Sequence, residues 1–191
     1  PNVDSKPRPV KSNIVYDPAQ TLADLSLWGA SLSWTVGGEN KKLYGGKWSW
    51  ANPTEVPAAG INSHEVHYEP SDGNYMPFNV MIDVTVAKAK PYLETIPTAA
   101  EITYGDSLGE SGLNGGKAVY GDGKGNTSSL TGGDAEVTGT FTWNTPDVKP
   151  AVSDSDTTEY EVIFTPTDIV NYETVTMQMK LTVNKAENAP N

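Results

Sequence analysis

The chain carries the same sequence pattern twice, with the two copies separated by about ninety residues. Each copy ends on a similar phrase, VTVAKA at residues 84–89 and LTVNKA at residues 181–186. An aromatic phrase precedes it in both copies, WSWANP at residues 48–53 and FTWNTP at residues 141–146. Such self-similarity is typical of a tandem array of one folding unit. Positions that agree between the copies therefore report a shared scaffold, and positions that differ report what one copy does alone.

The repeat predicts two domains, residues 1–89 and residues 90–191, each of a size that can bury its own core. The junction, KAKP at residues 88–91, has no Gly/Ser spacer, which favours a stiff pair over loosely tethered domains. Both ends of the sequence are similar to repeat boundaries. We therefore expect neighbouring repeats of the same chain as partners, and a monomeric chain.

The spacing of apolar residues favours strands. Apolar and polar residues alternate at residues 82–86, 161–164 and 177–183, which is the period of a half-buried β-strand. The 18 Gly and 14 Pro interrupt the chain too often for a sustained helical period. Short strands separated by turn residues are typical of a β-sandwich. The sequence therefore predicts an all-β chain of two tandem immunoglobulin-like antiparallel β-sandwiches.

The formal net charge of −11 argues against a nucleic-acid partner, because such binding depends largely on Lys and Arg side chains that displace counterions. Residues 1–89 carry 7 Lys+Arg against 9 Asp+Glu, a balance of −2, and residues 90–191 carry 6 against 15, a balance of −9. No apolar stretch has the length of a membrane-spanning helix, so we expect no membrane insertion. The absence of Cys excludes a disulfide framework and thiolate metal sites.

Several phrases of the second copy identify a resemblance to a known family. They are ITYGDSL at residues 102–108, GTFTW at 139–143, FTPTD at 164–168, NY at 171–172 and LTVNKA at 181–186. This set resembles the immunoglobulin-like repeats found in tandem in large secreted and cell-surface proteins of bacteria, particularly gut Firmicutes. The resemblance implies an extracellular, non-catalytic module, secreted or attached to the cell surface, with a role in adhesion, display or spacing. The first copy departs from the pattern in a Trp-rich stretch.

Few residues are candidates for catalysis. The two His, His64 and His67, lie three residues apart on a predicted strand and therefore on opposite faces, so they cannot jointly bind a metal. No nucleophile motif, zinc signature or phosphate-binding loop is present. We expect no enzyme activity.

The Gly-rich segment YGDGKGN at residues 120–126 is only superficially similar to a calcium loop, since Lys124 stands where an oxygen ligand belongs. We interpret it as a loop between strands and expect no cofactor; structural calcium is possible in principle but not indicated. The phrases DGNY at residues 72–75 and DIVNY at residues 168–172 recur at equivalent places, so we predict Asx turns with a packed Tyr.

Tryptophan distinguishes the two copies. Trp48 and Trp50 lie two apart on one predicted strand and match Phe141 and Trp143, so both pairs are predicted to be core. Trp28 aligns with Asn114 in the second copy. A Trp where the sister copy has a polar residue is expected to be exposed, and an exposed indole calls for an explanation.

Two more aromatic residues could extend an exposed strip. Trp34 aligns with Tyr120, although the alternation around it equally permits burial. Tyr44 aligns with Val137, and Lys41 and Lys42 lie nearby in a predicted hairpin.

We therefore predict that Trp28, Trp34 and Tyr44 bind a polysaccharide by stacking against sugar rings. The low charge of the first copy favours a neutral glycan, with starch-like α-glucans, cell-wall glycans and mucin sugars all open. Two alternatives remain: a passive spacer or stalk, and a protein-binding adhesin that uses an exposed sheet edge.

Overall fold

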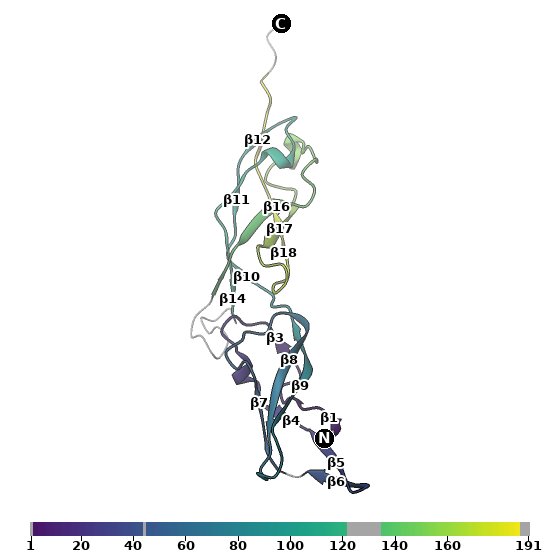
Figure 1. Cartoon of the computed structure of the whole chain (residues 1–191). Helices are drawn as coiled ribbons and strands as arrows, with labels where there is room; N and C mark the ends of the chain where they lie inside the picture. Colours follow the sequence, from purple (N-terminus) through teal and green to yellow (C-terminus); the bar gives the residue numbers. More distant parts are fainter. Residues whose placement is uncertain (1, 44, 122–134, 188–191) are drawn as a thin grey trace. The chain divides into compact units, whose positions relative to one another are not determined.

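The computed structural model of the chain describes residues 2–43, 45–121 and 135–187 (Figure 1). Within these ranges the secondary structure consists of β-strands and three short 3-10 helices, which confirms the all-β prediction. The chain divides into two compact units, Pro1–Lys88 and Ala89–Asn191. Each unit is described separately below.

The described residues of the first unit form nine strands and one 3-10 helix. These elements are β1 (Asn2–Ser5), β2 (Arg8–Pro9), β3 (Ile14–Val15), η1 (Leu22–Asp24), β4 (Leu27–Trp28), β5 (Ser31–Val36), β6 (Glu39–Leu43), β7 (Lys47–Trp50), β8 (Gly60–Glu69) and β9 (Phe78–Ala87). They form a four-stranded sheet in the order β3-β9-β8-β7, a three-stranded sheet β1-β5-β6 and a two-stranded sheet β2-β4.

The second unit repeats this strand order, but the counterpart of the four-stranded sheet is split in two, and its described residues add one 3-10 helix, η3. Its elements are β10 (Tyr92–Thr95), β11 (Thr98–Ala99), β12 (Ile102–Thr103), η2 (Leu108–Glu110), β13 (Leu113–Asn114), β14 (Lys117–Tyr120), β15 (Ala135–Val137), β16 (Gly139–Trp143), η3 (Val152–Asp154), β17 (Tyr160–Pro166), β18 (Val175–Met179) and β19 (Val183–Asn184). Its sheets are β10-β14-β15, β11-β13, β12-β19 and β16-β17-β18.

Each unit has one pair of parallel strands, β3 with β9 in the first unit and β12 with β19 in the second. In the first unit Ile14 of β3 lies opposite Val86 of β9, and in the second unit Ile102 of β12 lies opposite Val183 of β19, with both pairs parallel. The prediction of purely antiparallel sheets is therefore wrong for these two strand pairs. Parallel pairing needs a long connection, and here almost the whole unit lies between the two strands.

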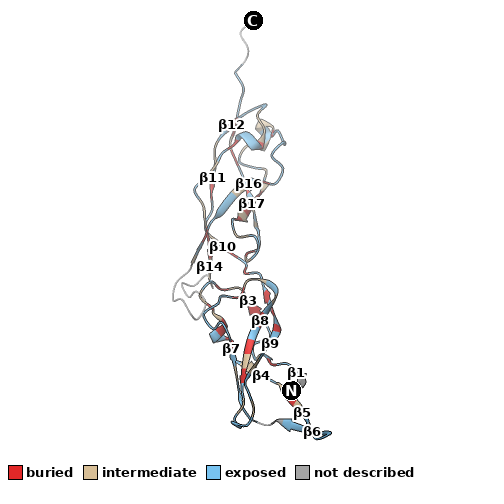
Figure 2. Ribbon diagram, viewed as in Figure 1, coloured by how far each residue is buried: buried red, intermediate tan, exposed pale blue. Residues whose placement is uncertain are grey.

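Burial alternates along the long strands of the first unit, as Figure 2 shows for β8 and β9. Ile82, Val84 and Val86 of β9 are buried, while Asp83 and Thr85 between them are exposed. This confirms the strand predicted over residues 82–86. The buried side of this sheet packs against the 3-10 helix η1 and the half-buried Leu27 of β4.

The Trp shared by both copies fixes the short helix against the sheet. Trp50 is 8% exposed and its Nε1–H donates to the Leu25 carbonyl at 2.7 Å. Trp143 is 6% exposed and donates to the Ser111 carbonyl at 3.0 Å. Leu25 and Ser111 each follow the last residue of a 3-10 helix, where carbonyl groups lack intrahelical partners. The prediction that these two Trp are core residues is confirmed.

A second pair of aromatic contacts also matches between the copies, and it involves the residues two positions before the shared Trp. Trp48 packs against Tyr68 with a ring-centroid distance of 4.8 Å and an interplanar angle of 47°. Phe141 packs against Phe164 at 5.0 Å and 48°. Because both copies use the same ring geometry, we assign these aromatic pairs to the scaffold.

The short helices themselves begin at similar capping residues. The Thr21 N–H donates to Asp24 Oδ2 at 2.8 Å, and the Ser107 N–H donates to Glu110 Oε2 at 2.7 Å. This spacing, a hydroxyl residue followed three positions later by an acid, is the capping-box pattern that starts a helix.

The strand predicted over residues 177–183 is interrupted. β18 ends at Met179 and β19 begins at Val183. The loop that carries η3 bonds to the interruption: the Val183 N–H donates to Ser155 Oγ at 3.0 Å, and the Asp156 N–H donates to the Leu181 carbonyl at 3.0 Å. These bonds take the place of strand pairing, so this part of the prediction is wrong.

The Asx turn predicted at residues 72–75 is confirmed, whereas at residues 168–172 the Asp side chain bonds a backbone N–H three residues on instead of two, so that turn is wider than an Asx turn. The Asn74 N–H donates to Asp72 Oδ1 at 2.9 Å, and the Asn171 N–H donates to Asp168 Oδ1 at 3.1 Å. Tyr172, which follows the second turn, is buried. Recurrence in both copies gives these polar residues a structural role.

Candidate functional site

Trp28 lies on the surface of the first unit. It is the second residue of β4, and its neighbour Leu27 packs against the core. Successive side chains on a strand point to opposite faces, so the indole of Trp28 points outward. Trp28 is 63% exposed, in agreement with the exposure expected from the sequence.

Arg8 lies beside Trp28. It faces Trp28 across the antiparallel pair β2-β4, and its guanidinium carbon lies 5.4 Å from the centroid of the indole ring. A guanidinium within about 6 Å of an aromatic centroid is attracted by the ring quadrupole. Within the part of the chain that the structure describes, no carboxylate forms an ion pair with Arg8. The guanidinium therefore lies against the ring and orients it.

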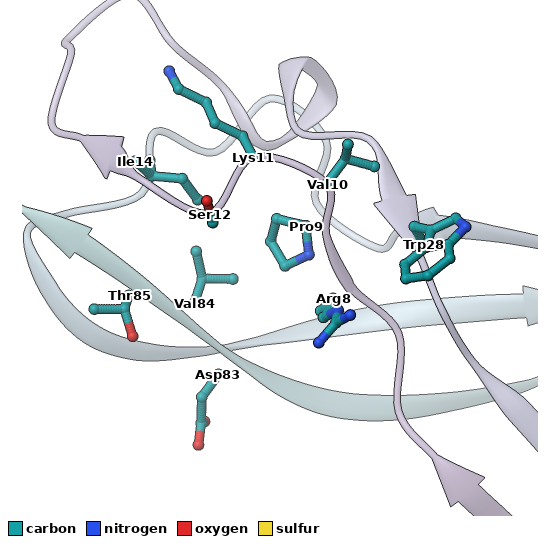
Figure 3. A pocket seen from close by; sticks show the side chains of 10 residues that line it. All are labelled: Arg8, Pro9, Val10, Lys11, Ser12, Ile14, Trp28, Asp83, Val84 and Thr85. Atoms are coloured by element: carbon teal, nitrogen blue, oxygen red, sulfur yellow. The ribbon is translucent and has the colours of Figure 1, made fainter.

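A hollow of about 480 Å³ adjoins this pair (Figure 3). Its polar wall includes Arg8 and Lys11 from the N-terminal segment, and Asp83 and Thr85 from β9. The full lining is Arg8, Pro9, Val10, Lys11, Ser12, Ile14, Trp28, Asp83, Val84 and Thr85. An aromatic surface combined with a few polar groups is the usual composition of a small-molecule or sugar site.

Asp83 is held in place by a neighbouring hydroxyl. Its carboxylate accepts a hydrogen bond from Ser63 Oγ on the adjacent strand β8. Asp83 is itself exposed on the outward face of β9. A fixed, solvent-accessible carboxylate can accept hydrogen bonds from ligand hydroxyl groups.

Trp28 also borders a second hollow of about 390 Å³. Its other walls include Gly45 and Gly46 before β7, and the aromatic side chains of Trp48 and Tyr68. Arg8 does not line this second hollow. The indole therefore lies between two depressions of the surface, one lined by Arg8, Lys11 and Asp83 and one lined by aromatic rings and Lys47.

The other two predicted binding residues are not placed beside Trp28. Trp34 lies in β5 opposite Lys41 of β6, and its side chain lies outside the described part of the structure. Tyr44 lies outside the described residues. Leu43, and not Tyr44, occupies the register position of Val137, so the alignment used for Tyr44 is wrong by one residue. Of the three predicted residues, Trp28 alone has a described side chain.

The sequence analysis missed Arg8, Lys11 and Asp83. A signal for the first two was present, because the segment KPRPVK at residues 6–11 gathers three cations in an acidic chain. Recognising them as neighbours of Trp28 required the pairing register of β2 with β4, which the sequence does not reveal.

The two His occupy opposite sides of β8, as predicted. His64 is buried, with Nδ1 at 3.1 Å from Glu55 Oε1, and its ring lies edge-on to Trp50 at a centroid distance of 6.2 Å. Its Nε2 is buried and has no hydrogen-bond partner among the described residues. His67 lies on the other face, with Nδ1 at 2.7 Å from Asn79 Oδ1. Hydrogen bonds to Asn79 and Glu69 raise the pKa of His67 above 6.5.

One further hollow recurs in both units at eight matched positions. In the first unit it is lined by Ala23, Leu25, Ser26, Leu27, Trp48, Ser49, Trp50 and Pro53. In the second unit it is lined by Gly109, Ser111, Gly112, Leu113, Phe141, Thr142, Trp143 and Pro146. A depression that follows the shared core Trp in both copies is a consequence of the fold.

No group of three or more His, Asp or Glu side chains that could hold a metal ion occurs among the described residues. Most of the Gly-rich segment at residues 120–126 lies outside them. No helix in the described ranges is long and apolar enough to cross a membrane. Comparisons with protein families, curated proteins and solved structures give no match.

Proposed function

We propose that this chain is a non-catalytic, extracellular module of two immunoglobulin-like β-sandwiches that binds polysaccharide through Trp28 on its first unit. The observation that carries this proposal is the exposed indole of Trp28, bordered by two hollows and by the guanidinium of Arg8. The second unit has Asn114 at the same register position. The fold therefore does not require an indole there.

The immunoglobulin-like part of the proposal is supported by the strand order. The N-terminal segment of each unit pairs first with one sheet, as β2 with β4, and then crosses to the other, as β3 with β9. The family resemblance of the second copy points the same way, and it is the basis for placing the module on a bacterial surface or in a secreted protein.

Binding would proceed by burial of the C–H face of a sugar ring against the indole. This removes apolar area from water at about 25 cal/mol per Å² and leaves orientation to polar groups at the rim. Arg8, which lies beside the indole, can donate hydrogen bonds to sugar hydroxyl groups. A single stacking residue gives weak binding, which neighbouring repeats in one chain would strengthen through multivalency.

A passive spacer is the second candidate. It is favoured by the close match of the two units, which share their core Trp hydrogen bond, aromatic pair and capping pattern. A spacer needs a repeated scaffold and nothing more. It gives no account of the differences around Trp28.

The test is affinity gel electrophoresis and pull-down of the whole chain on a panel of neutral and acidic polysaccharides, including starch, cellulose, xylan and polygalacturonate. Trp28→Ala is compared with Asn114→Ala, which alters the matched position of the second unit. We expect retention on at least one polymer that is lost in Trp28→Ala and kept in Asn114→Ala. Retention on none of them, or retention that Trp28→Ala leaves unchanged, would overturn the proposal and favour the spacer.

A further inference from the structure

The surroundings of Trp28 are more basic than the chain as a whole. Lys6, Arg8 and Lys11 lie within six residues of one another, with no acidic residue between them, in a chain of net charge −11. All three are exposed. The matched stretch of the second unit, IPTAAE at residues 96–101, contains no cation. The basic stretch is therefore a property of the first unit and not of the fold.

The strand register makes this comparison definite. Arg8 lies opposite Trp28, and Thr98 lies opposite Asn114 in the same antiparallel pair of the second unit. The second unit thus replaces both the guanidinium and the indole. Arg8 and Trp28, which contact one another, are thus both present in the first unit and both replaced in the second.

The loop beside this pair also differs in length. The Val10 N–H donates to the Ser26 carbonyl and the Ala100 N–H donates to the Gly112 carbonyl, so Val10 and Ala100 are equivalent. Residues 11–13 separate Val10 from β3, whereas a single residue, Glu101, separates Ala100 from β12. The longer loop carries Lys11 and Ser12, which line the hollow, whereas in the second unit the residue after Ala100 is Glu101.

Arg8 is well placed to bind an anion. A guanidinium that lies by an indole directs its N–H groups outward in the plane of the fork, which matches the two oxygens of a carboxylate or sulfate. Lys11 also lines the hollow, but its side chain points away from Arg8 and Trp28 (Figure 3), so its positive charge acts on a ligand at Arg8 only at longer range. Asp83 is the one acidic residue in the lining. It accepts a hydrogen bond from Ser63, and its side chain points away from Arg8 and Trp28 (Figure 3).

We propose that the hollow beside Trp28 binds an acidic sugar residue, whose carboxylate or sulfate pairs with Arg8 while its ring packs on the indole. This rests on the proposed function and replaces the neutral glycan expected from the charge of the first copy. The net charge of the chain opposes general attraction to a polyanion, so binding to an acidic polymer reports this local site.

The experiment compares polymers that differ only in charge. The whole chain is titrated against polygalacturonate and its methyl ester, and against dextran sulfate and dextran, at low and moderate salt. The first pair tests a carboxylate and the second a sulfate. The variants are Arg8→Thr and Lys11→Glu, which introduce side chains that the second unit tolerates, with Lys149→Thr as a control that removes one positive charge from the second unit.

We expect the charged member of at least one pair to bind about tenfold more tightly than its neutral partner, because a charge-assisted hydrogen bond is lost in the neutral form. The preference should disappear in Arg8→Thr, weaken in Lys11→Glu and persist in Lys149→Thr, and added salt should reduce it. Equal binding of charged and neutral polymers that still requires Trp28 would overturn this inference and leave the proposed function standing. Binding to none of these four polymers would overturn this inference, and retention on no polymer in either experiment would overturn the proposed function as well.

Discussion

The hydrogen bond from the shared Trp to the end of the 3-10 helix should be a main source of stability in each unit. The test is Trp143→Phe in the second unit, with Trp50→Phe as the same change in the first. Phe keeps an aromatic ring in the core but removes the indole N–H that donates to Ser111 or Leu25. Both acceptor residues are almost fully buried, at 3% and 1% exposure.

The expected cost follows from this burial. A buried carbonyl that loses its donor without gaining water costs about 1–3 kcal/mol. The smaller ring leaves unfilled space in the core and adds about 1 kcal/mol. The free energy of unfolding of the affected unit should therefore fall by about 2–4 kcal/mol, a large share of the roughly 5–15 kcal/mol typical of a domain.

The assay must report each unit separately, because a two-unit chain does not unfold as one two-state system. Hydrogen exchange read by mass spectrometry assigns protection to peptides, and those from β17 and β8 report the two cores. Trp143→Phe should lower protection in β17, and Trp50→Phe should lower it in β8. Trp28→Phe is the matched control, since Trp28 is exposed and should change protection by less than about 0.5 kcal/mol. If Trp143→Phe changes protection no more than the control does, the hydrogen bond does not stabilise the fold and our reasoning fails.

Two further predictions test other parts of the structure. Gly139→Ala would place a Cβ at 2.5 Å from Phe164 Cζ, so we expect the free energy of unfolding of the second unit to fall by about 1–3 kcal/mol, read as lower hydrogen-exchange protection in β17, and unchanged protection would refute the close packing. The pKa of His67 should lie above 6.5 because Asn79 and Glu69 stabilise its protonated form, so NMR titration of Asn79→Ala should show a lower pKa than in the parent chain. Any contribution of His67 to stability should be present below pH 6.5 and lost as the pH rises through its folded pKa.

Much of the scaffold could be predicted because the sequence contains two copies of one folding unit, and positions that match between them report the shared core. Trp50 and Trp143 match at the same place in each copy, and both are buried. The parallel edge of β3 with β9 could not be predicted, because it joins strands from opposite ends of a unit and leaves no periodic signal. The break after β18 depends on one loop that bonds to it, and that loop has no equivalent helix in the first unit.

The candidate site was predictable only in part. The comparison with Asn114 indicated that Trp28 is exposed, since a polar residue in the sister copy shows which way the position faces. Arg8 lies far from Trp28 in sequence and becomes its neighbour only through strand pairing. Tyr44 was misaligned because it follows the connection between β5 and β6. The corresponding connection, between β14 and β15 in the second unit, is much longer. Residues after the connection therefore cannot be aligned by counting from residues before it.

The differences around Trp28 carry more information about function than its exposure alone. An indole on the surface leaves apolar area in water and contributes little to the folding free energy. The second unit closes the same strand pair with Thr98 opposite Asn114, so neither Arg8 nor Trp28 is needed to form β2 and β4. The matched hollow beside the core Trp occurs in both units and follows from the fold. The hollow of Arg8 and Lys11 depends on residues and a loop length that only the first unit has, and it is therefore the place where a specific ligand should be sought.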